Sequence, residues 1–317
     1  MQTGDRWRWG GLIGSAALAT AGGIGLSLYS EAVARAIERQ VPADGRFLEV
    51  EGARLHYVDR GRGPAIVMIH GLGGQLRNFS YAMLDRLAAT HRVILIDRPG
   101  SGYSTATGDL PGIAGQAAIV ARAIAMLGLE RPLLVGHSLG GAVALALALD
   151  HGALIRGLAL IAPLTQHQDE VPEAFKALAV MPASLRRVLA QTVGTPMGQW
   201  TVERTRRAAF APEPAPDDFA TRGGGALALR PGNIAAAAAD LAAAHADMAA
   251  IAARYARLAM PTAILFGRDD AILDPAIHGG RTAGIIPGAR LTLIDGGHML
   301  PVTQPEATIR FVEEAAA

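Results

Sequence analysis

The 317-residue sequence contains no cysteine, which excludes disulfide frameworks, thiolate metal sites and cysteine nucleophiles. It also lacks a strong excess of either charge, since the formal net charge is +1. This balance gives no indication of nucleic acid or another polyanion as a partner. Lysine is nearly absent, because Lys176 is the only one, and alanine is abundant. We interpret this bias as that of a GC-rich bacterial genome.

Charge is also missing from a long stretch near the N-terminus. The 22 residues from Trp9 to Ser30 carry none, and as a helix they would extend about 33 Å, enough to cross a bilayer. Arg6 and Arg8 precede them and favour a cytoplasmic N-terminus. We therefore expect residues 1–40 to anchor the chain by a single pass in a bacterial inner membrane, with the main domain in the periplasm. The alternative is a signal segment cleaved after residues 17–19, which would release the protein to the periplasm.

The remaining residues, 41–317, alternate between two kinds of pattern. Two short strands are expected within 45–63, and longer apolar runs then alternate with helical stretches such as 79–90, 115–128 and 142–152. Buried strands that alternate with helices predict an α/β fold with a mostly parallel, doubly wound sheet. The expected buried strands are 64–71, 91–100, 131–138, 155–163, 260–270 and 289–298.

The alternation stops over about 164–258. This stretch is rich in proline, includes an expected loop at 211–218, and has helical pieces, such as the alanine-rich 233–258, but no clear strand. Because it interrupts two expected core strands, we interpret it as a helical insertion packed over one end of the sheet, where a lid would lie.

A serine stands at the sharpest expected turn of the chain. The segment Gly136-His137-Ser138-Leu139-Gly140 has the pattern G-x-S-x-G and lies between an expected strand and an expected helix. Such a turn strains the serine backbone, and bulkier side chains two residues away on either side would clash. It also places the hydroxyl at a helix N-terminus, where free N–H groups favour developing negative charge. The competing interpretation is a glycine-rich turn in which Ser138 only caps the helix.

Several motifs occur together with this turn, in a fixed order. With them, over about residues 45–163 and 259–317, the chain resembles the serine-nucleophile branch of the α/β-hydrolase fold family. The insertion resembles nothing that would identify a substrate. The motifs are HGLGG (70–74), DRPGSGYS (97–104), GHSLGG (136–141), GRDDAILDP (267–275) and GGHML (296–300).

The resemblance implies a catalytic triad. Ser138 would be the nucleophile, and His298 would be the base that a serine hydroxyl requires at neutral pH. Asp270, 28 residues before His298, would be the acid that orients the histidine. Asp269 is the alternative acid, one residue out of register with the family pattern.

The resemblance also implies an oxyanion hole, built from two backbone N–H groups. Leu139 would supply one of them, and Leu72, in the loop after the 64–71 strand, would supply the other. His70 is expected to shape that loop, and Asp97 to tie down the loop that follows the next strand. His137 is expected to pack behind the turn and not to act as the base.

The function implied is hydrolysis of an ester or related acyl bond in a small, largely apolar substrate, with no metal or organic cofactor. Families that resemble haloalkane dehalogenases or epoxide hydrolases carry an aspartate where this chain has Ser138, which argues against both. Cofactor-free haloperoxidases (perhydrolases) and C–C bond hydrolases keep the serine triad and remain alternatives. A non-enzymatic scaffold on a hydrolase fold is a further alternative.

Overall fold

A single central sheet holds most of the buried apolar runs. In the computed structural model the strands pair in the order β1-β2-β4-β3-β6-β7-β8-β9, and the short β5 pairs with β2. The strands are β1 (Arg46–Val50), β2 (Ala53–Arg60), β3 (Ala65–Ile69), β4 (Arg92–Ile96), β5 (Thr105–Ala106), β6 (Leu133–His137), β7 (Gly157–Ile161), β8 (Thr262–Gly267) and β9 (Arg290–Ile294).

The sheet is mostly parallel, as the alternation of strands and helices predicted. Strands β4, β3, β6, β7, β8 and β9 run parallel to one another, whereas β1 and β2 are antiparallel to their neighbours. Strands β3, β6 and β7 are buried along their whole length, which explains their uninterrupted apolar sequences. The carboxyl ends of the parallel strands share one edge of the sheet, where ligand sites of such folds form.

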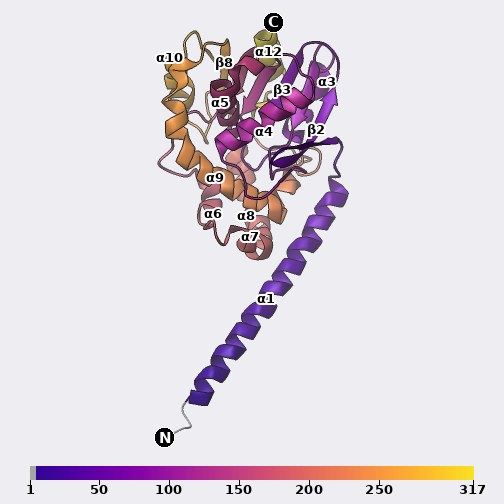
Figure 1. Cartoon of the computed structure of the whole chain (residues 1–317), viewed down its shortest axis with the longest axis vertical. Coiled ribbons are helices and arrows are strands. Elements are labelled where there is room, and N and C mark those ends of the chain that lie inside the picture. Colours follow the sequence, from indigo (N-terminus) through magenta and orange to yellow (C-terminus); the bar gives the residue numbers. More distant parts are fainter. Residues whose placement is uncertain (1–4) are drawn as a thin grey trace.

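Helices cover both faces of the sheet. Helices α4, α5 and α9 pack on one face in the larger apolar core, and α2, α3 and α12 pack on the other. Figure 1 shows these layers around the strands. The helices are α1 (Asp5–Gln40), α2 (Arg77–Ser80), α3 (Leu84–Leu87), α4 (Ile113–Met126), α5 (Leu139–His151), α6 (Lys176–Ala179), α7 (Arg186–Leu189), α8 (Thr195–Phe210), α9 (Pro231–Ala252), α10 (Thr282–Ile285), α11 (Leu300–Thr303) and α12 (Pro305–Ala316).

The segment between β7 and β8 forms only helices and loops. It contains α6, α7, the π-helical turn η3 (Ala190–Gly194), α8 and α9. The long alanine-rich helix α9 contacts both α4 and α5, so it connects this inserted segment to the main core. Among the described residues, α9 is the one helix long and apolar enough to span a membrane. Its packing within the domain identifies it as a core helix.

The N-terminal helix α1 projects away from the rest of the molecule (Figure 1). The structure describes the backbone of residues 5–317, and the side chains from residue 20 onward except that of residue 174. Much of the expected span from Trp9 to Ser30 therefore lies outside the described side chains. The described part of α1 changes character near its middle, because residues 20–29 are mostly exposed whereas Ser30, Ala34 and Ile37 are buried.

One helix prediction was wrong in detail. The stretch 79–90 was expected to form one helix, but the structure has two short ones, α2 and α3, separated at residues 81–83. Tyr81, at the break, binds the inserted segment: its carbonyl accepts a hydrogen bond from Arg222, and its hydroxyl donates one to Asp218. Contacts between residues so far apart in the sequence compete with the local helix pattern. The local sequence does not reveal them.

We predict that Leu160→Ala, in the fully buried strand β7, lowers the free energy of unfolding by about 2–5 kcal/mol, because it leaves a cavity in a tightly packed core. Leu293→Ala in the half-exposed edge strand β9 is the matched control. Urea denaturation of the full chain in non-ionic detergent measures both. Equal losses in the two variants would show that the sheet centre is not the core described here.

Candidate active site

The turn at Ser138 connects β6 directly to α5. Ser138 has φ of 54° and ψ of −122°, a backbone conformation that is strained for a residue with a side chain. Its N–H donates to the carbonyl of Ile161 in β7 (3.1 Å), and its carbonyl accepts from the N–H groups of Gly141 (2.8 Å) and Leu164 (2.9 Å). These backbone bonds hold the strained conformation in place.

Glycines surround this turn because the neighbouring backbones approach it closely. A Cβ at Gly136 would overlap the carbonyl of Gly140, and a Cβ at Gly140 would overlap the carbonyl of Ile69 in β3. A Cβ at Gly71 would lie 2.8 Å from the Cβ of Ser138. The G-x-S-x-G pattern therefore reflects close packing of the turn against β3 and the loop that follows it.

His298 and Asp270 meet at the same edge of the sheet. His298 follows β9, Asp270 follows β8, and the His298 Nδ1 lies 2.7 Å from the Asp270 Oδ2. The other carboxylate oxygen of Asp270 accepts hydrogen bonds from the N–H groups of Ile272 (2.9 Å) and Leu273 (3.0 Å). Burial alone raises the pKa of Asp270, but the charge of His298 and these hydrogen bonds outweigh it, so the pKa lies below its ordinary value.

The structure brings Asp270, and not Asp269, to His298. The side chain of Asp269 is exposed, and its N–H donates to the carbonyl of Gly296. The hydroxyl of Ser138 makes no hydrogen bond within the part of the chain that the structure describes, and the residue is 9% exposed. Hydrogen bonds between a nucleophile and its base are often long in the absence of substrate. The Ser138 hydroxyl is therefore available to interact with an incoming group.

Two backbone N–H groups near the Ser138 turn are the expected donors of an oxyanion hole. Leu139 is the first residue of α5, so its N–H has no partner within the helix. Leu72 lies in the loop after β3, next to Gly71, which packs against Ser138. Neither N–H donates to a protein acceptor among the described residues. Both are thus available to a negatively charged oxygen near Ser138.

His70 shapes this loop. Its Nε2 accepts a hydrogen bond from the N–H of Arg98 (2.9 Å), so its proton is on Nδ1, which donates to the carbonyl of Gly71 (2.9 Å). Burial and the positive charge of Arg98 lower the pKa of His70 well below its ordinary value. The imidazole is therefore neutral and serves as a fixed connection between the two loops.

Sequence reasoning missed a buried charge network behind this loop. The guanidinium of Arg98 is fully buried and donates to the carbonyls of His70 (3.0 Å) and Gly71 (2.9 Å). It also donates to Gln116 on α4 and to the carboxylate of Asp240 on α9, each at 2.8 Å. Arg98 therefore links the loop of Leu72 to the inserted segment. The available signal was Asp240 itself, a carboxylate within an otherwise alanine-rich run.

Asp97 and His137 stabilise the loops around the site. The carboxylate of Asp97 accepts hydrogen bonds from the N–H groups of Leu76 (2.7 Å) and Tyr103 (2.9 Å) and lies 2.7 Å from the Nδ1 of His56. His137 lies buried behind the turn, with its Nε2 3.0 Å from the carbonyl oxygen of His298. It therefore supports the loop that carries His298.

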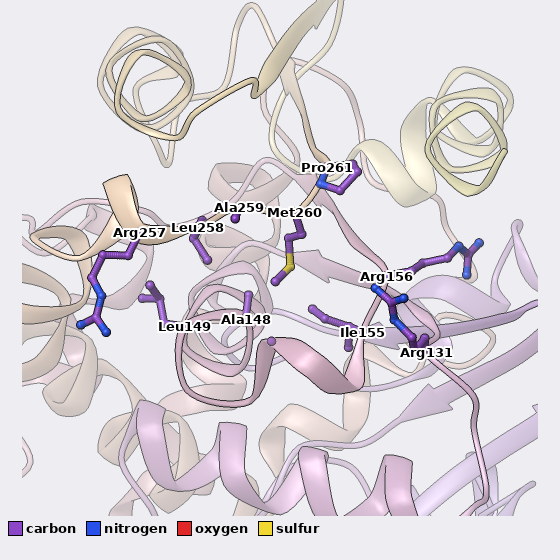
Figure 2. A pocket seen from close by; sticks show the side chains of 11 residues that line it. Arg131, Ala148, Leu149, Ile155, Arg156, Arg257, Leu258, Ala259, Met260 and Pro261 are labelled. Carbon is purple, nitrogen blue, oxygen red and sulfur yellow. The ribbon is translucent and has the colours of Figure 1, made fainter.

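A cavity of 390 Å³ lies elsewhere, between the end of α5 and the start of β7 and β8. This is the amino-terminal edge of the parallel strands, opposite Ser138. Figure 2 shows Arg131 and Arg156 on one side of it and Arg257 on the other. Since Arg156 is already bonded to the carbonyls of Ala65 and Ala316, these groups do not form a convergent binding site. No cluster of three or more potential metal ligands occurs among the described residues.

We predict that the protein loses stability as the pH falls below about 6.5, the ordinary value for histidine. Burial lowers the pKa of His137 to about 3 and that of His278 to about 4. Because these groups stay neutral when folded but take up protons when unfolded, acid favours the unfolded state until the pH reaches the folded values. His137→Gln, which keeps a donor for the His298 carbonyl, is expected to show a shallower decline in urea midpoint between pH 6.5 and 4. The control is His151→Gln, at the half-exposed end of α5. If the urea midpoint of His137→Gln declines with pH as steeply as that of the wild type, this account is contradicted.

We also predict that Asp240→Asn costs about 3–5 kcal/mol of stability, because it leaves the Arg98 charge buried without a counter-charge. The double variant Arg98→Met/Asp240→Leu removes both charges but leaves the carbonyls of His70 and Gly71 and the side chain of Gln116 without these partners, so it is expected to recover only part of that loss. Urea denaturation compares the three proteins. If the double variant is less stable than Asp240→Asn, the network stabilises the fold mainly through its hydrogen bonds and packing and not through charge pairing.

Comparison with known proteins agrees with the architecture. A family model described as the alpha/beta hydrolase fold matches residues 64–305. A relative from Variovorax paradoxus, named as a carbamate hydrolase, is 32% identical over 79% of this chain and 91% of its own length. The acetyltransferase component of an acetoin-cleaving system from Cupriavidus necator is 38% identical over 128 residues, but this match spans only 34% of that protein.

Solved structures share the fold at lower identity. The enol-lactonase from Burkholderia xenovorans is 23% identical with a TM-score of 0.70, covering 85% of this chain and 98% of its own. A bacterial membrane phospholipase A is 20% identical with a TM-score of 0.68, and 98% of both chains is covered. Since the family model matches well over half of the sequence, the chain belongs to the α/β-hydrolase fold family.

Proposed function

We propose that the protein is a serine hydrolase that cleaves a carboxylic ester, or a related acyl bond, of a small and largely apolar substrate. Membership of the fold family alone does not decide this, because one fold supports many functions. The observation that carries the proposal is the strained turn at Ser138, placed at the same sheet edge as the hydrogen-bonded pair His298 and Asp270. This combination is what acyl transfer by a serine nucleophile requires.

In the proposed mechanism, the Ser138 oxygen attacks the substrate carbonyl carbon while the Nε2 of His298 takes the hydroxyl proton. Asp270 holds His298 in the tautomer that leaves Nε2 free and stabilises the imidazolium that forms. The N–H groups of Leu72 and Leu139 donate to the oxyanion. His298 then protonates the leaving oxygen. Water, deprotonated by His298, attacks the carbonyl carbon of the acyl-enzyme, and His298 returns that proton to the Ser138 oxygen as the acid is released. These steps require no metal or organic cofactor.

The relatives support this reaction class without identifying the substrate. The names of the compared proteins refer to a carbamate, an enol-lactone and a phospholipid, each of which contains a carbonyl open to the same attack. A substrate panel should therefore include a carbamate and a lactone beside simple esters.

We assign a lid function to the inserted segment of about residues 164–258. Its loop at Gly223 accepts hydrogen bonds from the side chains of Gln75 and Asn78, just after the loop of Leu72. Its helix α9 also supplies Asp240 to Arg98. These contacts support a segment that both covers the site and fixes the loop of the proposed oxyanion hole.

We assign a membrane-anchor function to α1. The uncharged run from Trp9 to Ser30 and the projection of α1 away from the domain support this assignment (Figure 1). Arg6 and Arg8 favour a cytoplasmic N-terminus, so the catalytic domain would face the periplasm of a bacterial cell.

We predict that Ser138→Ala abolishes hydrolysis of p-nitrophenyl acetate, butyrate and octanoate above background. Asp270→Asn is expected to lower kcat roughly 10⁴-fold, because the histidine would lose the group that fixes its tautomer. The matched control is Asp269→Asn, which changes the neighbouring, exposed carboxylate and should leave kcat nearly unchanged. Initial rates in detergent measure all three.

Labelling by a fluorophosphonate distinguishes the reasons for a negative result. A folded wild-type protein that hydrolyses none of the panel but is labelled at Ser138 would have its substrate outside these esters, carbamates and lactones. A protein that neither turns over the panel nor reacts with the probe would contradict the proposal and favour a non-enzymatic scaffold.

A further inference from the structure

The outer face of the inserted segment carries an unusual number of exposed apolar side chains. Trp200 on α8 is 87% exposed, the most exposed of the large apolar side chains in the described part of the chain. Four other exposed residues precede it along the same helical stretch. We refer to the set as the apolar strip: Leu185, Val188, Val193, Met197 and Trp200.

The strip lies on one face of a continuous helix. Helix α7, the π-helical turn η3 and α8 follow one another with helical backbone at each junction. Within α-helix, residues three or four apart share a face, which fits the intervals 185–188, 193–197 and 197–200. Val188 and Val193 are five residues apart and lie on either side of the start of the π-turn. In a π-turn the hydrogen bonds join residues five positions apart, instead of four as in an α-helix. The π-turn thus keeps both halves of the strip in line.

The opposite face of this helix is buried in the domain. Ala190 of η3 packs with Ile234 and Ala238 of α9 in a small apolar cluster. The nearby Asp240 of α9 then binds Arg98 at the loop of the proposed oxyanion hole. The strip is therefore the outer side of a well-packed helix, one helix away from the site.

Charges within the strip's own helical stretch are basic, and the acidic groups at its borders, Glu31 on α1 and Glu203 on α8, are each paired with an arginine. Between Glu173 and Glu203 the chain has no acidic residue, but it has Lys176, Arg186 and Arg187. Lys176 pairs with Glu173 at 2.6 Å. Neither arginine forms an ion pair with any residue that the structure describes. Arg187 is exposed, whereas Arg186 is half-buried with its Nε enclosed and without a hydrogen-bond partner among the described residues. An apolar surface with arginines beside it matches the headgroup region of an anionic bilayer.

Helix α1 leaves the domain across this same helix. The hydroxyl of Tyr29 donates to the side chain of Gln199 (2.8 Å), next to Trp200, and the hydroxyl of Ser30 donates to the carbonyl of Thr192 (3.3 Å). Just before these contacts, Ile24 and Leu28 on α1 are exposed. Figure 1 shows α1 projecting from the end of the molecule that carries α7 and α8. The strip thus lies beside Tyr29 and Ser30, at the end of the uncharged run of α1 nearest the domain.

We propose that the apolar strip rests on the surface of an anionic phospholipid bilayer, with Trp200 in the interfacial layer and Arg186 and Arg187 at the headgroups. The proposal rests on the proposed anchoring through α1, since a spanning α1 would bring Tyr29 to the membrane boundary and Trp200 beside it. Tryptophan and tyrosine are the residues enriched at that boundary. Helix α1 and the apolar strip would then both hold the domain at the membrane, with the inserted segment facing the lipid.

The fluorescence of Trp200 in vesicles tests this directly. The chain has three tryptophans, so Trp7→Phe/Trp9→Phe leaves Trp200 as the only one. The full-length variant is reconstituted into vesicles of phosphatidylglycerol and phosphatidylcholine in equal parts. We expect strong quenching by lipids that carry a doxyl group near the headgroup, a blue-shifted emission maximum, and little quenching by iodide in the buffer.

The matched control moves the tryptophan to a surface far from the strip. Met126 lies at the exposed end of α4, near the opposite edge of the sheet, so Met126→Trp with all three native tryptophans changed to Phe should be quenched by iodide and not by doxyl lipid. Arg186→Gln/Arg187→Gln should weaken the doxyl quenching of Trp200, by reducing its affinity for the anionic surface roughly fivefold per arginine. The same substitutions should have little effect in pure phosphatidylcholine.

Three outcomes would overturn the proposal. They are failure of the vesicles to retain the protein, quenching of Trp200 by iodide as strong as that of the control, and protection of Trp200 from both quenchers. The last would indicate that a second copy of the chain covers the strip. Hydrolysis of p-nitrophenyl butyrate in detergent, measured on the same variants, should be unaffected, so a failure here is distinct from a failure of the proposed hydrolase activity.

Discussion

The backbone of Ser138 is the constraint on which the site depends. A residue with a side chain at φ of 54° carries a strain of about 1–3 kcal/mol, which persists only when its surroundings fix it. Here β7 accepts its N–H, two later N–H groups bind its carbonyl, and the glycines at 71, 136 and 140 let neighbouring backbones close around it. The same turn that strains the serine also exposes the first N–H of α5. The proposed nucleophile and one proposed oxyanion donor are thus consequences of one local geometry.

A second constraint is electrostatic and joins parts of the chain that are distant in sequence. The buried guanidinium of Arg98 is stable only because carbonyls of the loop after β3, Gln116 and Asp240 satisfy its donors. A buried ion pair is weak evidence for added stability, because desolvation offsets much of the attraction. What it supplies here is position: the loop that carries Leu72 and the inserted helix α9 cannot move independently without exposing an unpaired charge.

Much of the fold could be predicted from local pattern. Runs such as those of β3, β6 and β7 are apolar throughout because both faces of a parallel strand are buried, and this signal does not depend on distant residues. The Asp270–His298 contact was implied by the family resemblance, and the structure has both residues in loops that follow parallel strands, at the same edge of the sheet. Their roles in catalysis remain predictions.

Features that depend on distant contacts could not be predicted in this way. The break between α2 and α3 depends on the inserted segment binding Tyr81, and Arg98 meets Asp240 across 142 positions of the sequence. The π-turn that aligns the apolar strip has no distinctive local composition. The exposure of Trp200 is likewise a property of the packed molecule, since an isolated tryptophan in a helix is ordinarily buried.

The most direct test of the central claim is to trap the covalent intermediate that a serine nucleophile would form. The full-length protein is mixed with p-nitrophenyl butyrate, quenched in acid within the first turnovers, digested, and analysed by mass spectrometry. We predict one butyryl group on the peptide that contains Ser138, with a matching burst of p-nitrophenol, and neither in Ser138→Ala. Turnover without this adduct, or a butyryl group on another residue in an active enzyme, would contradict the assignment of Ser138 as the nucleophile.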